Sequence, residues 1–200
     1  MTREELIASV EAQLSPRRFQ HTKGVAATAR RLAAMYGEDE NKAEIVGWIH
    51  DVAREWPEEK VLRYAEDIEI PNGFAVMPKL LHGPVAARLL SERYGIHDED
   101  MANAICYHTT GRVGMSPLEK IVALADSIEP GRNYAGVEEL REAAEENLNL
   151  ALARSLDAVI VYLIERHQSI FPLTVMARND LWEQYQRQEE SQTGGRESVN

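Results

Sequence analysis

The spacing of apolar residues along this 200-residue chain is helical almost throughout. Val25, Ala29, Leu32 and Tyr36 recur at intervals of three or four residues, which places them on one face of a helix that ends at Gly37. No run of alternating β-branched residues extends beyond a few positions. The pattern therefore predicts an all-α fold.

Start and stop signals divide this pattern into separate helices. Ser15 and Ser116 are each followed by proline, the arrangement of an N-cap with proline in the first turn, and Asp98 is a third N-cap. A largely buried helix is predicted over residues 40–54, and one long helical stretch over residues 137–166.

The end of the chain differs in composition from the rest. Residues 191–200 contain a Gly-Gly pair and a single large apolar side chain, Val199, which predicts a disordered tail. Because no linker or internal repeat is visible before it, residues 1–190 are expected to form one domain.

Composition narrows the classes of function. With 44% hydrophobic and 28% charged residues, the chain can bury one sizeable core and is not disordered. The 33 acidic residues exceed the 22 Lys and Arg residues, giving a net charge of −11, which repels phosphate backbones. General binding to nucleic acid is disfavoured, and an anionic substrate would need a local positive site.

Cysteine content and the N-terminus indicate the compartment. Cys106 is the only cysteine, so neither an internal disulfide nor a thiolate metal cage can form, and a reducing cytoplasm is expected. The chain starts with two acids among its first five residues, where a signal peptide has a basic region. No stretch reaches the ~20 apolar residues of a membrane span. We expect a soluble cytoplasmic protein that does not bind membranes.

Five titratable residues lie on helix faces that the pattern predicts to be buried: His21, His50, Asp51, His108 and Asp126. An unpaired buried charge is costly, so each needs a partner or a function. His82 stands at a predicted helix start, where an imidazole and free backbone N–H groups could meet an anion. A simple loop histidine explains that position equally well.

Each of these residues also has a simpler explanation when taken alone. A single histidine on an apolar face is more often a hydrogen-bonded core residue than a ligand. Asp126 could cap the turn before Pro130, and Asp51 could face solvent. The occurrence of all these residues on buried faces favours a metal ion, because one ion would take the imidazoles and carboxylates as ligands and so offset the cost of burying them. Nitrogen and oxygen donors without sulfur favour Fe, Mn, Co, Mg or Zn in a reactive site.

Longer motifs around these residues resemble the YqeK-type branch of the HD-domain phosphohydrolases, an all-helical superfamily. The adjacent His50-Asp51 pair, with His21 before it and Asp126 after it, is similar to the H…HD…D metal pattern of the superfamily. The resemblance covers about residues 15–141, through Arg18-Phe19-Gln20-His21, Gly47-Trp48-Ile49-His50-Asp51, Leu81-His82-Gly83, His108-Thr109-Thr110-Gly111 and Leu124-Ala125-Asp126-Ser127-Ile128-Glu129-Pro130-Gly131-Arg132.

The resemblance implies an HD-domain helical bundle with symmetrical bis(5'-nucleosyl)-tetraphosphatase activity, which splits diadenosine tetraphosphate into two ADP. It implies a divalent metal, iron first, with Mn, Co and Mg as alternatives, bound as one or two ions. The implied metal ligands are His21, His50, Asp51 and Asp126.

The resemblance also implies roles around the metal. His82 and His108 would hold a second metal or the phosphate, and together with Arg54 they form the predicted catalytic group. Arg54 stands where the family often has lysine. The predicted substrate-binding residues are Arg18, Asp51, Arg54, His82, His108, Thr109, Asp126 and Arg132.

The expected reaction is attack by a metal-activated hydroxide on a phosphorus beside the central bridging oxygen, with ADP as the leaving group. Two other functions remain open. The chain could be another HD-type phosphohydrolase acting on nucleoside monophosphates, cyclic nucleotides or guanosine polyphosphates, or a regulatory module that binds nucleotide without turnover. A homodimer is compatible with each of these functions.

Overall fold

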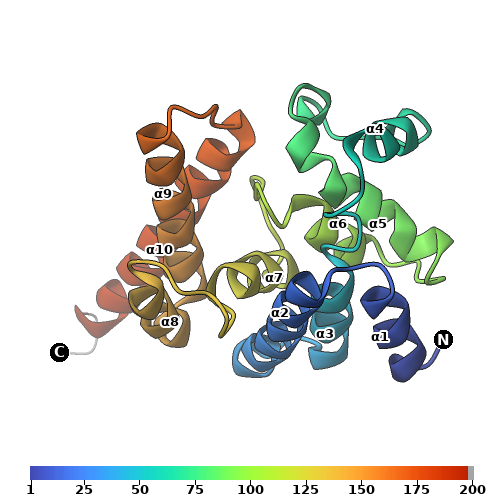
Figure 1. The fold of residues 1–200 in the computed structure, drawn as a ribbon. Helices are drawn as coiled ribbons and strands as arrows, with labels where there is room; N and C mark the ends of the chain where they lie inside the picture. Colours follow the sequence, from blue (N-terminus) through green and yellow to red (C-terminus); the bar gives the residue numbers. More distant parts are fainter. Residues whose placement is uncertain (198–200) are drawn as a thin grey trace. The chain divides into compact units, whose positions relative to one another are not determined.

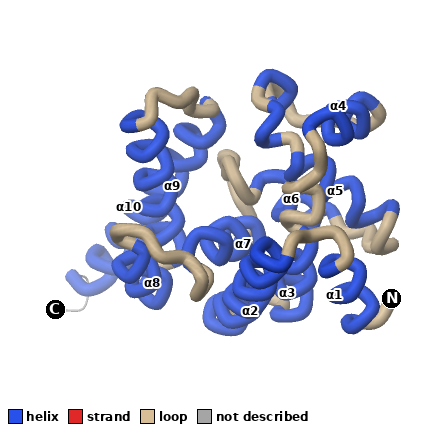
Figure 2. The backbone as a smooth tube through the Cα atoms, in the orientation of Figure 1, coloured by secondary structure: helices blue, strands red, loops and turns tan. Residues whose placement is uncertain are grey.

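The computed structural model describes the backbone of residues 1–197 and the side chains of residues 1–193. Within this range every regular element is a helix, which confirms the all-α prediction (Figures 1 and 2). None of these helices is both long and apolar enough to cross a membrane. In chain order they are α1 (Arg3–Glu11), α2 (Pro16–Tyr36), α3 (Glu40–Ile49), α4 (Glu58–Glu66), the 3₁₀ turns η1 (Phe74–Val76) and η2 (Pro78–Leu80), α5 (His82–Glu92), α6 (Glu99–Tyr107), α7 (Pro117–Ile128), α8 (Val137–Glu146), α9 (Leu148–Glu165) and α10 (Pro172–Glu197).

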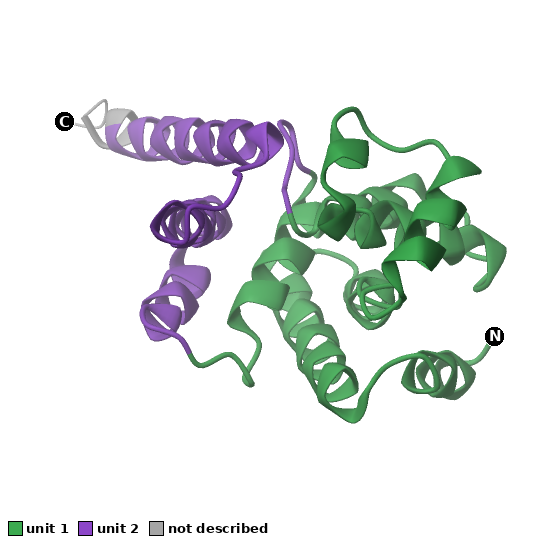
Figure 3. Ribbon diagram, turned by 45° about the horizontal axis from the view of Figure 1, so that its top comes forward, with its two compact units in different colours: residues 1–109, 116–133 green, residues 110–115, 134–200 purple. Residues whose placement is uncertain are grey.

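The chain divides into two compact units (Figure 3). The first comprises residues 1–109 and 116–133, and therefore holds α1 to α7 and every predicted site residue. The second comprises residues 110–115 and the chain from 134 onward, with α8 to α10. Folding of residues 1–190 as one domain stays a prediction.

The predicted helix starts are confirmed. Ser15 Oγ accepts a hydrogen bond from the backbone N–H of Arg18, three residues into α2. Ser116 and Glu119 form a reciprocal capping box at the start of α7, and Asp98 caps α6 through its side chain. These caps satisfy N–H groups that lack a partner in the first helical turn.

The prediction of one continuous helix over residues 137–166 is wrong at one point. The helix is interrupted at Asn147, which separates α8 from α9. Asn147 has an extended backbone, with φ −156° and ψ 124°, and its side chain accepts hydrogen bonds from the N–H groups of Asn149 and Leu150. The side chain thus caps the start of a new helix, a role that asparagine fills more readily than a position in the middle of a helix.

The predicted helix over residues 40–54 also ends early, because α3 stops at Ile49. Beyond it the backbone continues in tighter turns, with hydrogen bonds from Val52 N–H to Ile49, from Arg54 N–H to Asp51 and from Trp56 N–H to Ala53. Apolar spacing is nearly the same in both conformations over so few residues, so the sequence pattern did not distinguish them.

The structure differs from the predicted tail over residues 191–197, which continue α10 as far as Glu197. Ser191 Oγ donates to the carbonyl of Arg187, and Thr193 Oγ1 lies within hydrogen-bond distance of the carbonyl of Glu189. Both hydroxyls therefore bond one turn back within the helix. The prediction for residues 198–200 lies outside the described residues.

The core of the first unit lies between α2, α3, α6 and α7. Helix α7 is buried almost around its full circumference, which matches its uninterrupted apolar run. Two glycines permit close helix packing. A Cβ at Gly47 would lie 2.6 Å from the Cα atom of Ala26 in α2, and one at Gly83 would lie 2.6 Å from the carbonyl oxygen of Cys106 in α6. These contacts set the spacing of the segments that carry the predicted site.

Substitution of Gly47 by alanine is expected to destabilise the protein. The added methyl group meets backbone atoms of Ala26, which cannot rotate away as a side chain could. We expect the free energy of unfolding to fall by about 1–3 kcal/mol, even though alanine favours helices more than glycine does. Urea unfolding measures this difference, and an unchanged midpoint would contradict the close packing of α3 on α2.

Glu44 gives the fold a defined pH dependence. Its carboxylate is buried and accepts hydrogen bonds from Arg3 of α1 and, at 2.7 Å, from Arg30 of α2. Burial acts to raise the pKa of Glu44, but the hydrogen bonds from Arg3 and Arg30 outweigh it and lower this pKa. A carboxyl whose folded-state pKa is depressed stabilises the protein above its unfolded pKa, and this stabilisation is lost as pH falls through the folded pKa.

We therefore expect E44Q to be less stable than the wild type at pH 7. The difference should shrink once pH falls below the ordinary glutamate pKa of about 4.3, because the wild-type carboxyl becomes protonated as well. Chemical unfolding of both proteins from pH 7 to pH 3 tests this. A difference of constant size across that range would be inconsistent with a charged Glu44.

Candidate metal centre

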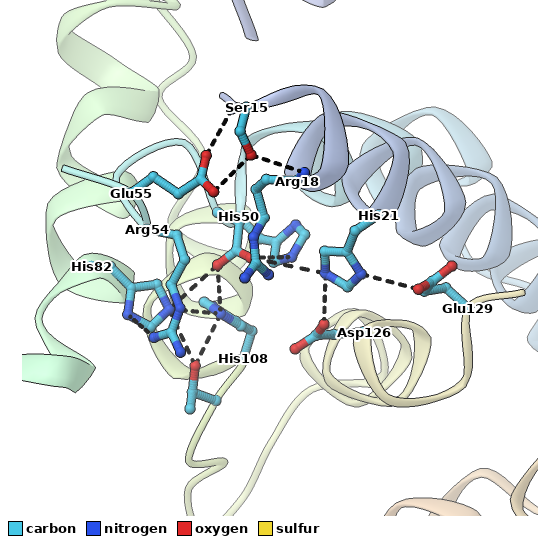
Figure 4. Close-up of polar contacts among 12 residues, drawn as sticks. Ser15, Arg18, His21, His50, Arg54, Glu55, His82, His108, Asp126 and Glu129 are labelled. Carbon is cyan, nitrogen blue, oxygen red and sulfur yellow. Dashed lines mark hydrogen bonds and ion pairs between the residues drawn. The ribbon is translucent and has the colours of Figure 1, made fainter. Parts of the chain in front are cut away.

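The structure brings together six of the residues that the sequence singled out (Figure 4). They come from five separate segments: His21 from α2, His50 and Asp51 from the turn after α3, His82 from the start of α5, His108 from the end of α6, and Asp126 from α7. We call these six residues the imidazole–carboxylate cluster. His50, Asp51, His82 and His108 are buried, while His21 and Asp126 are partly exposed at its edge.

Asp51 lies at the middle of the cluster and is only 3% exposed. Its Oδ2 atom is 2.9 Å from Arg18 Nη1, 3.6 Å from His50 Nε2 and 3.9 Å from His21 Nε2. Its Oδ1 atom is 3.4 Å from His82 Nε2 and 3.7 Å from His108 Nε2. The two oxygens of one carboxylate therefore face two different sets of imidazoles.

Three of the histidines are oriented by backbone carbonyls. The Nδ1 atoms lie 2.7 or 2.8 Å from the carbonyl oxygen three residues earlier: His50 from Gly47, His82 from Lys79 and His108 from Ile105. Because a carbonyl oxygen only accepts hydrogen bonds, this geometry places the proton of His50 and of His108 on Nδ1. His82 Nδ1 differs, because it also lies 3.0 Å from Arg54 Nη1, which only donates. The Nε2 atoms of His50 and His108 then face Asp51 with a lone pair, the orientation of a metal ligand, and His82 Nε2 lies 3.1 Å from His108 Nε2.

The charge state of the cluster suits a cation. Burial lowers the pKa of His50 to about 4 and that of His82 to about 3, so both are neutral at neutral pH. Burial acts to raise the pKa of Asp51 and of Asp126, but neighbouring imidazoles outweigh it and lower both. The cluster thus offers neutral nitrogen donors beside ionised carboxylates.

The pKa values of the other two histidines, His21 and His108, are raised. Burial acts to lower the pKa of His21, and the adjacent Asp126 raises it, with His21 Nε2 at 3.0 Å from Asp126 Oδ1. His108 is similar, because Asp51 raises its pKa against the effect of burial. Both histidines therefore hold a proton more readily than a free histidine does.

The donor set fits a divalent metal ion. Ligand atoms of His21, His50 and Asp126 lie within 4.8 Å of one another, and so do those of His50, Asp51 and His108. His50 Nε2 is buried without a hydrogen-bond partner, and His21 Nε2 is too, because it meets Asp126 outside hydrogen-bond geometry. Buried polar atoms are rarely left unpaired, and coordination to a cation would use both lone pairs.

A cavity of about 660 Å³ opens beside His21. Its basic lining residues are Arg17, Arg18, Lys23 and Arg132, and its acidic ones are Glu55 and Glu129. Arg18 and Arg132 line the cavity and also contact the cluster, because Arg18 donates a hydrogen bond to Asp51 and Arg132 Nη2 lies 2.6 Å from Asp126 Oδ1. A positive rim thus borders the cluster, within a chain of net charge −11.

The remaining predicted residues lie on the other side of Asp51. Thr109 Oγ1 is 3.0 Å from His108 Nε2 and 3.4 Å from His82 Nε2. Arg54 Nη1 lies 3.1 Å from the carbonyl oxygen of Lys79 and 3.0 Å from His82 Nδ1. Neither Arg54 nor Thr109 is among the described residues that line the cavity.

The structure adds one residue to which the sequence had assigned no role. Glu129 directly follows α7, is 4% exposed, and its Oε1 atom lies 3.1 Å from His21 Nδ1. The only sequence signal was an acid at the end of the buried run that contains Asp126, and that signal does not point to His21.

Comparisons with known proteins agree with this geometry. The model of a protein family described as "HD domain" matches residues 18–131, more than half of the chain. A Bacillus subtilis protein named "Bis(5'-nucleosyl)-tetraphosphatase, symmetrical" is 42% identical over 180 residues, covering 90% of this chain and 97% of the relative. A Staphylococcus aureus protein of the same name is 34% identical, covering 84% of this chain and 88% of that one.

A solved structure is also similar. It belongs to a Clostridium acetobutylicum protein described as a predicted HD superfamily hydrolase involved in NAD metabolism. The two chains are 41% identical and superpose with a TM-score of 0.87, covering 92% of this chain and 98% of the other. Both the family match and these near full-length relatives confirm the resemblance read from the motifs. The chain therefore belongs to the HD-domain family, within the branch of the symmetrical bis(5'-nucleosyl)-tetraphosphatases.

Proposed function

We propose that this protein is a hydrolase that cleaves diadenosine tetraphosphate, and related dinucleoside polyphosphates, symmetrically into two ADP. One observation carries the proposal: a chain of this branch holds an imidazole–carboxylate cluster at the edge of a basic cavity. The substrate class is the one that the names of the relatives give. The cavity volume lies in the range of small-molecule sites.

We propose His21, His50, Asp51 and Asp126 as the metal ligands. His82 and His108 would hold a second ion or the phosphate, since they face the opposite oxygen of Asp51. The two sets of nearby ligand atoms, His21–His50–Asp126 and His50–Asp51–His108, share His50, which supports binding of one or two ions. We propose iron, with Mn, Co or Mg as alternatives. When bound, such an ion supplies a water-derived nucleophile at neutral pH and relieves charge on phosphoryl oxygens.

The positions of the arginines support binding of a polyphosphate across the cluster. Arg18 and Arg132 border the cavity on the Oδ2 side of Asp51, while Arg54 lies beside His82 on the Oδ1 side. Arg–phosphate hydrogen bonds are charge-assisted and fix orientation as well as supplying affinity. Cationic groups on both sides of Asp51 support binding of a phosphate on each side of the central bridging oxygen. Thr109 is a proposed contact to the nucleotide.

The charge distribution supports a small anionic substrate rather than nucleic acid. The basic residues of the cavity give a local positive site, whereas the net charge of −11 repels an extended phosphate backbone. Reduced Cys106, as the only cysteine, supports the prediction of a cytoplasmic protein.

Asp126→Ala tests the metal centre. The substitution removes a ligand at the edge of the cluster, so we expect loss of bound divalent metal and of hydrolysis, with an unchanged helical circular-dichroism spectrum. Elemental analysis of protein purified without chelators measures the metal. Asp157→Ala is the matched control, because Asp157 pairs with Arg178 in the second unit and should leave the metal content unaltered. Full metal retention in D126A would exclude the proposed ligand set.

Product analysis tests the substrate and the position of cleavage. We expect diadenosine tetraphosphate, incubated with the protein and Fe²⁺ or Mn²⁺, to give ADP as the dominant product by ion-exchange chromatography. Equal amounts of AMP and ATP would mean asymmetrical cleavage and would contradict the proposal. Turnover of a guanosine polyphosphate or a cyclic nucleotide alone would favour another HD-type phosphohydrolase, and binding without products would favour a regulatory module.

Arg132→Ala tests the proposed phosphate contact. Loss of one charge-assisted hydrogen bond to phosphate costs about 1.5–3 kcal/mol, so we expect kcat/KM to fall by about tenfold to a hundredfold. Arg63→Ala is the control, since Arg63 pairs with Glu59 on the surface of α4 and does not line the cavity. Equal kcat/KM values for the Arg132 and Arg63 variants would exclude this role.

A further inference from the structure

His21 differs from the other three histidines in what holds its ring. His50, His82 and His108 lie at helix ends, where each Nδ1 atom meets a backbone carbonyl three residues earlier. His21 lies inside α2, where the backbone carbonyls are already used by the hydrogen bonds of the helix. Its Nδ1 atom instead meets the carboxylate of Glu129, at 3.1 Å from Oε1 (Figure 4).

Glu129 is held in place from several directions. Its Oε2 atom accepts a hydrogen bond of 2.6 Å from the backbone N–H of Gly131. Gly24, one helical turn beyond His21, leaves room for the carboxylate, because a Cβ at that position would collide with Oε2. The side chain is buried, so its position does not depend on solvent. A fixed carboxylate therefore lies against the face of α2 that carries His21.

We propose that Glu129 is a positioning residue for the metal centre. Its carboxylate accepts the Nδ1 proton of His21, which leaves the Nε2 lone pair directed towards Asp126 and Asp51. Hydrogen bonds of this kind fix the tautomer and the ring orientation of a ligating histidine and increase its basicity. A charged acceptor does so more strongly than the carbonyls that orient the other three histidines.

The role rests on the metal centre proposed above, and it extends that centre beyond the four primary ligands. It does not depend on which nucleotide is cleaved. Its test therefore uses the full-length metal-free protein and Co²⁺ alone, whose affinity is measured by visible absorption in competition with a chelator.

Glu129→Ala should weaken Co²⁺ binding by about 10- to 100-fold, the usual effect of removing such a partner. Glu129→Gln should lie between this variant and the wild type, because an amide oxygen can accept the His21 proton without supplying a charge. Glu44→Gln is the matched control: it alters a buried glutamate of α3 that lies outside the cluster, and should leave Co²⁺ affinity within about twofold of wild type.

A double-variant cycle separates positioning from a structural role. If Glu129 acts through His21, adding E129A to H21A should change Co²⁺ affinity by no more than about twofold. A merely structural glutamate would weaken binding to the same extent with or without His21, and that result would overturn the proposal. Wild-type affinity in E129A would overturn it as well. Failure of the wild-type protein to bind Co²⁺ would overturn the metal centre itself, whereas a failure of the nucleotide assay alone leaves this result unaffected.

Discussion

Burial of the Asp51 carboxylate is the constraint around which the first unit is arranged. A carboxylate with 3% exposure loses its hydration, a penalty of several kcal/mol that only close compensating groups can offset. These groups come from segments far apart in the sequence, with Arg18 and the surrounding imidazoles all within 4 Å of the two oxygens. Helices α2, α3, α5 and α6 therefore have to meet at one place, and the small residues Gly47 and Gly83 allow the close approach.

The same arrangement prepares the site for chemistry. Helix ends leave carbonyl oxygens without intrahelical partners, and His50 and His108 use such carbonyls to set their protonated nitrogen. Their other nitrogens point inward and are fixed before any ligand arrives, so little reorganisation is needed on binding. The basic rim at Arg18 and Arg132 adds a local attraction for phosphate to a molecule that is acidic as a whole.

Local signals in the sequence predicted local structure well. Caps at Ser15 and Ser116 depend on side chains a few residues away, so composition and spacing suffice to recognise them. The break at Asn147 was missed because asparagine is compatible with a helix interior as well as with a cap, and tertiary packing decides between them. The ligand candidates were recognised as polar residues on buried faces. Glu129 was not, because its contact with His21 spans 108 positions and leaves no periodic signal.

The central claim is that the cluster around Asp51 binds a divalent metal ion. Anomalous X-ray scattering from crystals of this protein grown with Mn²⁺ tests it most directly. The account predicts a strong anomalous peak within coordination distance of His50 Nε2 and the Asp51 carboxylate. A cluster without any such peak, in crystals where Mn²⁺ is bound elsewhere or not at all, would contradict it.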